Sequence, residues 1–150
     1  MKNKQQFGFL IILLAAVFST LAFVIWPTLY ASNKQVTASD VANPEAVVQE
    51  FYNAYLHYNG HPLVDKVYRS NQRLTPGFVA FLDDFTQGEM HFDPVLCAQD
   101  KPAGITTHPA QMSGDRAVVG VTDSFPGHQF SVELVQIDGE WKIDRVVCSP

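Results

Sequence analysis

The chain has 150 residues, of which 10 are Lys or Arg and 15 are Asp or Glu, so its formal net charge at pH 7 is −5. This length fits one small domain with a terminal extension, and it excludes an enzyme built from separate cofactor and substrate domains. Beyond Ala31 there are 8 Lys or Arg and 15 Asp or Glu, a formal charge of −7 without a basic cluster. We therefore expect no nucleic-acid partner, because phosphate backbones are bound by concentrated positive charge.

The first 31 residues are expected to be a membrane anchor or an export signal. Lys2 and Lys4 precede residues 7–26, of which 17 are apolar. Twenty helical residues extend about 30 Å, which matches the hydrocarbon core of a bilayer, and Pro27 ends such a helix. The lysines favour a cytoplasmic N-terminus and place the rest of the chain outside. A cleaved signal peptide is the alternative, because Ala31 offers a small residue at the cut.

Cys97 and Cys148 are the only cysteines of the chain. Both interpretations of the N-terminal segment deliver them to an oxidising compartment, where a single intramolecular disulfide is expected. Closing a loop of about 50 residues stabilises a fold by roughly 4 kcal/mol through chain entropy. A redox-active pair or two free thiols are the alternatives, although redox couples are usually close in sequence.

Residues 32–43 are mostly small and polar and are expected to link the N-terminal segment to an exported domain of residues 44–150. A first helix begins at Asn43-Pro44-Glu45, where Asn caps, Pro fits the first position and Glu complements the helix dipole. A shorter second helix is predicted over residues 63–70. A third begins at Thr75-Pro76 and ends at Gly88, and its predicted buried face contains Phe78, Phe81, Leu82 and Phe85.

The second half of the chain changes to the alternating pattern of strands. Residues 117–122, 130–134 and 141–147 are predicted strands, and another is expected to begin near Ile105. Asp138-Gly139 between the last two is a strong hairpin signal. The expected fold class is therefore α+β, with two or three N-terminal helices packed on one face of a curved antiparallel sheet of about four strands.

This order of elements resembles the nuclear-transport-factor-two-like superfamily, also called cystatin-like or ketosteroid-isomerase-type, whose domains are cone-shaped. Residues 93–102 and 141–146 are similar to strings found in an uncharacterised bacterial envelope family of that superfamily. The resemblance covers residues 44–150. It implies a cone fold on the periplasmic side of the bacterial cytoplasmic membrane, or in the periplasm after cleavage, and pairing of two copies through the open sheet face. It implies no particular reaction.

Two groups of residues are candidates for a binding site. Tyr52, Tyr55 and Trp141 either line an apolar pocket for a small molecule or fill the core. Asp93, Gln99 and Asp100 surround Cys97 in a stretch with two prolines. Two carboxylates and an amide there would bind a polar group or supply a general base, whereas the structural alternative is that they hold loop backbone.

No metal site or cofactor is expected, because His57 and His61 are separated by Gly60 and no cofactor motif is present. The sequence favours a non-enzymatic, membrane-anchored envelope module that binds a small apolar ligand or a partner protein. One alternative is a small isomerase or hydrolase with Asp93 or Asp100 as base and a Tyr as hydrogen-bond donor. The other is an acidic inhibitor or immunity-type protein whose charge complements a basic target.

Overall fold

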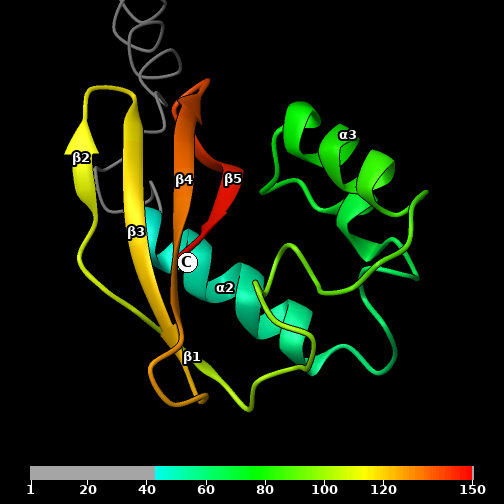
Figure 1. Ribbon diagram of the computed structural model, residues 1–150. Coiled ribbons are helices and arrows are strands. Elements are labelled where there is room, and N and C mark those ends of the chain that lie inside the picture. The colour runs from blue at the N-terminus through cyan, green and yellow to red at the C-terminus, as the bar shows by residue number, and fades with distance from the viewer. Residues whose placement is uncertain (1–42, 150) are drawn as a thin grey trace, which may run out of the picture. The chain divides into compact units, whose positions relative to one another are not determined.

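A computed structural model describes residues 43–149, which form helices followed by an antiparallel sheet (Figure 1). The expected anchor at residues 1–31, and all but the last residue of the expected linker 32–43, lie outside the described residues. The helical elements are α2 (Pro44–His57), the 3-10 helix η1 (Val67–Ser70) and α3 (Pro76–Phe85). The strands are β1 (Ile105–Thr107), β2 (Gln111–Ser113), β3 (Arg116–Asp123), β4 (Gln129–Ile137) and β5 (Glu140–Cys148).

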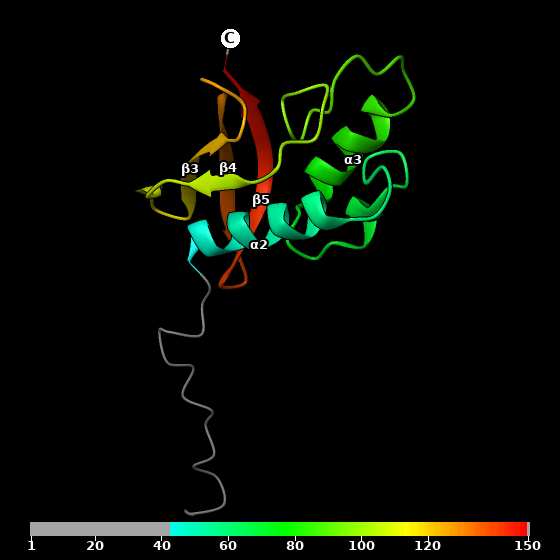
Figure 2. The same cartoon turned by 90° about the horizontal axis from the view of Figure 1, so that it is seen from below.

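Helix α2 supplies the aromatic layer that covers the sheet. It begins at Asn43, whose side-chain oxygen accepts a hydrogen bond from the backbone N–H of Ala46 at 2.7 Å, and Pro44 occupies the first turn. The buried side chains of α2 recur at helical spacing and face the sheet. Figure 2 shows α2 running across strands β3, β4 and β5, and this packing builds the centre of the core.

The sheet has the strand order β1-β3-β4-β5. Strands β1 and β2 pair with the same edge of β3, β1 near its C-terminal end and β2 near its N-terminal end. Every pairing between these strands is antiparallel. Strands β4 and β5 meet in the hairpin predicted at Asp138-Gly139, where both residues have positive φ as a type I′ turn requires. Alternate side chains of β3, β4 and β5 are buried, so one face of the sheet belongs to the core.

Helix α3 lies beyond the β5 edge of the sheet instead of across its face (Figures 1 and 2). The reason is a short extended segment before the helix that hydrogen-bonds to β5. The Thr75 N–H donates to the Ile143 carbonyl at 2.9 Å, and the Ile143 N–H donates to the Arg73 carbonyl at 2.7 Å. The Thr75 hydroxyl also donates to Asp144 at 2.9 Å and accepts the N–H of Phe78, which caps α3. The start of α3 is therefore fixed to the sheet edge.

The predicted cone-shaped fold is wrong for two reasons. The described domain has two α-helices and five strands, and only one of those helices covers the sheet. The helix expected over residues 63–70 is limited to turns and η1, because Lys66 adopts a left-handed conformation with φ of 55°. Among residues 43–149, no helix has the length and apolar character needed to cross a bilayer.

The outer end of α3 is held to η1 by Asp83. One carboxylate oxygen of Asp83 accepts hydrogen bonds from the Tyr68 hydroxyl at 2.7 Å and from Arg69 Nε at 2.8 Å. The hydrogen bond from Arg69, followed by that from Tyr68, lowers the pKa of the Asp83 carboxyl from its usual value of 3.8. A carboxyl whose pKa is lower in the folded chain stabilises the fold above its unfolded pKa, and that contribution disappears as the pH falls through the folded pKa.

We expect Asp83→Asn to make thermal stability less sensitive to acid than in the wild type. The variant should melt at a lower temperature near neutral pH, and this difference should close as the pH falls from about 5 to about 2. Circular dichroism melts across that range measure the effect. Asp84→Asn is the matched control, since Asp84 is exposed and pairs with no cation within residues 43–149. Equal acid sensitivity of Asp83→Asn and the wild type would contradict the prediction.

Candidate functional site

The segment of residues 93–98, called here the stapled loop, folds back on itself. The Asp93 N–H donates to the Ala98 carbonyl at 2.7 Å. One carboxylate oxygen of Asp93 accepts the backbone N–H of Val95 at 2.8 Å and that of Leu96 at 3.3 Å. An aspartate that bonds to the backbone two or three residues ahead is a turn-forming arrangement, so Asp93 shapes this loop directly.

Two tyrosines of α2 attach the stapled loop to the core. The buried hydroxyl of Tyr52 donates to the Val95 carbonyl, and the hydroxyl of Tyr55 donates to the second oxygen of Asp93, both at 2.7 Å. Tyr52 and Tyr55 are three residues apart and so lie on the same face of the helix. One helix face therefore holds two successive points of the loop.

Burial governs the protonation of this cluster. Burial, reinforced by the charge of Asp93, raises the pKa values of Tyr52 and Tyr55 well above their usual 10.0, so both hydroxyls remain hydrogen-bond donors. Burial also raises the pKa of Asp93, while the hydrogen bonds it accepts from Tyr55, Val95 and Leu96 act in the opposite direction. Both Asp93 oxygens are already used by groups of the protein.

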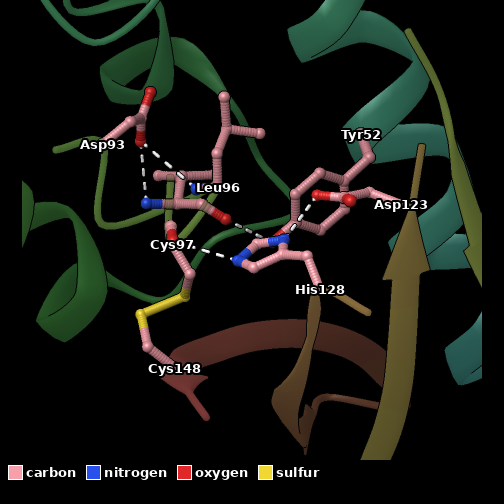
Figure 3. Close-up of a disulfide and its surroundings, with 8 residues drawn as sticks. Tyr52, Asp93, Leu96, Cys97, Asp123, His128 and Cys148 are labelled. Carbon is pink, nitrogen blue, oxygen red and sulfur yellow. Dashed lines mark hydrogen bonds and ion pairs between the residues drawn. A yellow bond between two sulfur atoms is a disulfide. The ribbon is translucent and has the colours of Figure 1, made fainter. Parts of the chain in front are cut away.

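A disulfide and a histidine fix the other side of the stapled loop (Figure 3). Cys97 and Cys148 are bonded, with their Cα atoms 5.4 Å apart, which confirms the predicted pairing and ties the loop to the end of β5. His128 Nε2 lies 3.1 Å from the Cys97 carbonyl oxygen, and His128 Nδ1 lies 2.6 Å from an Asp123 carboxylate oxygen. No sequence motif indicated His128, because its partners are 5 and 31 residues away.

The structure separates the sequence-predicted site residues into two groups. Tyr52, Tyr55 and Trp141 belong to the hydrophobic core, with exposed fractions of 0%, 3% and 6%. They fill the interior between α2 and the sheet. Gln99 and Asp100 are exposed and line an open groove of about 330 Å³, to which Asp93 also contributes. The groove runs between residues 60–64 and residues 90–101.

An exposed apolar surface beside this groove was missed by the sequence analysis. Phe78 and Leu82 of α3 are buried as predicted, but Phe81 is 50% exposed although it was placed on the buried face. Its ring centroid lies 6.1 Å from that of Phe85, which lies 5.5 Å from that of Phe92. Phe92 shares the groove wall with two further exposed apolar side chains. We call this surface the aromatic patch: Val64, Phe81, Phe85, Met90 and Phe92.

The charge around the aromatic patch is mainly negative. Asp84, Glu89 and Asp100 are exposed and form no ion pair with any residue between 43 and 149. Lys101 lines the same groove, but its ammonium donates hydrogen bonds to the backbone carbonyls of Tyr58 and Gly60 at 3.1 and 3.4 Å. These three carboxylates outnumber the one ammonium group, so their summed charge at this surface is negative.

Comparison with known proteins found similarity to a solved structure but not to a protein family. No protein-family model and no curated protein matches the chain, so the resemblance to the nuclear-transport-factor-two-like superfamily stays a prediction. Among solved structures, the chain is similar to a chain in the crystal structure of the type VI native effector-immunity complex Tae3-Tai3 from Ralstonia pickettii. The sequence identity is 25% and the TM-score 0.60, over 72% of this chain and 96% of that chain. That neighbour forms a complex with a partner protein.

Removing the disulfide should destabilise the domain strongly. The two cysteines are 51 positions apart, and opening a loop of that length lowers the free energy of unfolding by about 4 kcal/mol on the chain-entropy estimate. Urea unfolding of Cys97→Ser/Cys148→Ser, compared with the wild type under oxidising conditions, measures this. The reduced wild type is the control and should resemble the variant. A loss below about 1 kcal/mol would show that the loop is held without the bond.

Tyr52→Phe should lower the free energy of unfolding by about 1–3 kcal/mol, because it leaves the buried Val95 carbonyl without its donor while keeping the ring. Tyr58→Phe is the matched control, since Tyr58 is exposed and its change should stay within about 0.5 kcal/mol. Both are measured by urea unfolding. Equal effects of the two substitutions would argue against the buried hydrogen bond as an anchor.

Proposed function

We propose that this chain is an immunity-type protein, which binds a secreted effector protein and protects the cell that makes the chain. The observation that carries this proposal is the similarity to a chain of an effector-immunity complex, because it extends over 96% of that chain. The partner is accordingly a protein. The sequence also allows an acidic inhibitor with a basic target, and the negative net charge agrees with that role.

The role of a binder, as opposed to a catalyst, is supported by how the reactive side chains are used. Both cysteine sulfur atoms of the chain form the disulfide. The carboxylate oxygens of Asp93 accept hydrogen bonds that shape and anchor the stapled loop. The cysteines and Asp93 therefore have structural roles, and they make a rigid support for an exposed surface. Rigid surfaces bind proteins with a smaller loss of conformational entropy.

We further propose that the protein acts outside the cytoplasm, on the periplasmic side of the membrane. Residues 7–26 have the apolar composition of an export segment. A disulfide between distant residues is a form of stabilisation that suits an oxidising compartment. An effector that enters a neighbouring cell's envelope would meet its inhibitor there.

An isomerase or hydrolase that uses Asp93 as a base is the second candidate. It is favoured by the 2.7 Å contact between Asp93 and the Tyr55 hydroxyl, and by the raised pKa of Asp93, which are properties of a general base with its donor. This candidate requires Asp93→Asn to abolish function at a temperature at which the variant remains folded. Loss of function that follows only the loss of folded protein would count against it.

The proposed function is tested by competition between sister cells. A strain that lacks the gene for this chain, mixed on a solid surface with its parent, should lose viability, and the full-length chain supplied from a plasmid should restore it. The reason is that the free effector harms the recipient, whereas an effector bound to this chain does not. Recipient survival is measured by colony counts. A parent with an inactivated secretion system is the control attacker, and it should spare both recipients.

Survival of the recipient that lacks the gene, at the level of the complemented strain, would contradict the proposal. Equal killing of the complemented recipient would contradict it as well, provided that immunoblotting shows the chain at its normal abundance.

A further inference from the structure

The aromatic patch is a continuous surface and not a set of scattered side chains. The rings of Phe81, Phe85 and Phe92 follow one another with centroid separations of 6.1 and 5.5 Å. Phe92 then leads into the groove, whose walls include Val64 and Met90. Four of the five patch side chains are at least 40% exposed. Single exposed apolar residues need no explanation, whereas a contiguous group of them marks an interaction site.

The patch is held in place before any partner arrives. At the start of α3, Thr75 is hydrogen-bonded to Asp144 of β5. Farther along the helix, Asp83 is hydrogen-bonded to Tyr68 and Arg69. On the other side, residue 92 directly precedes the stapled loop, which the disulfide and the α2 tyrosines fix. Aromatic anchors on a rigid support are the usual centres of binding energy in protein interfaces.

The charges at the patch indicate the chemistry of the partner. Asp84 and Glu89 adjoin the patch residues Phe85 and Met90 in the sequence, and Asp100 lines the groove. None of the three has a cationic partner in the described domain, and Lys101 hydrogen-bonds to backbone carbonyls. A second copy of this chain would place these carboxylates against one another in a two-fold interface, which is unfavourable. A surface with Lys or Arg around an apolar centre is complementary.

The open face of the sheet is a weaker candidate. Its exposed apolar residues Val118 and Val147 are separated by the ion pair between Glu133 and Arg145, whose N–O distance is 2.8 Å. This face therefore neutralises its own charge and offers no comparable row of rings.

We infer that the aromatic patch is the surface with which this chain docks an effector protein, and that the effector presents an apolar site rimmed by Lys and Arg. This inference rests on the proposed function and names the surface that carries it out. The rings of Phe81 and Phe92 enter the apolar site, and Asp84, Glu89 and Asp100 face the basic rim.

The test uses the full-length chain in the competition between sister cells. Phe81→Ser/Phe92→Ser removes the exposed rings, and Val118→Ser/Val147→Ser is the matched control on the open sheet face, where the exposed fractions are 37% and 38%. Asp84→Lys/Glu89→Lys reverses the rim charge. Melting temperatures establish that each variant is folded.

Binding is followed with the photoreactive amino acid p-benzoylphenylalanine placed in the full-length chain at Phe81, or at Val147 as the control position. We expect crosslinking at Phe81, and not at Val147, to one basic protein that comes from the attacker. With that protein purified, loss of both rings should weaken binding at least about 30-fold, as expected for two hot-spot residues. Reversal of the rim charge should weaken binding most at low salt.

The outcomes distinguish the inference from the proposed function. Protection by the wild type and the sheet-face control, with its loss in the ring variant, supports both. Full protection by the folded ring variant overturns the inference and leaves the proposed function standing. If the wild type itself gives no protection, the proposed function fails. The inference then fails with it, and if the wild type protects, absence of a basic partner crosslinked at Phe81 overturns the inference alone.

Discussion

The stapled loop is the constraint on which the rest of this domain depends. Residues 93–98 accept hydrogen bonds from two tyrosine hydroxyls of α2 and are joined by a disulfide to the end of β5. A histidine of the β3–β4 turn also contacts them. These contacts come from three elements that are distant in the sequence. They hold in one place the segment that leads out of the α3 region and into the sheet, so that helices and sheet share one core.

The placement of α3 follows from a competition between burial of its apolar side chains and backbone hydrogen bonding at the sheet edge. Phe78 and Leu82 reach the core, but the hydrogen bonds that join residues 73–75 to Ile143 keep the helix at the β5 edge. The helix therefore cannot turn all of its phenylalanines inward. Phe81 remains exposed and Phe85 is only half-buried, and the ring of Phe85 lies next to that of Phe92. The backbone pairing at the sheet edge thus creates the apolar surface from which a binding function is inferred.

The Tyr55–Asp93 pair shows why residue identity alone is a poor guide to function. A buried carboxyl with a raised pKa beside a tyrosine hydroxyl has the chemistry of a general base. The same carboxyl also accepts two backbone N–H groups, and its turn-forming role accounts for each contact. An architecture that uses its reactive groups for rigidity is consistent with recognition of another protein, as the likeness to a chain of an effector-immunity complex suggests.

Local signals in the sequence determined the start of α2 at Asn43-Pro44, the start of α3 at Thr75-Pro76 and the hairpin at Asp138-Gly139, because capping and turn chemistry act over a few residues. Two cysteines behind an expected export segment predicted one disulfide, and the structure has it. The tertiary structure alone decided between pocket lining and core filling for Tyr52 and Trp141, which fill the core. It also decided that Phe81 is exposed and that His128 meets the Cys97 carbonyl. These outcomes depend on which face of each element another distant element covers, and periodicity along the chain does not contain that information.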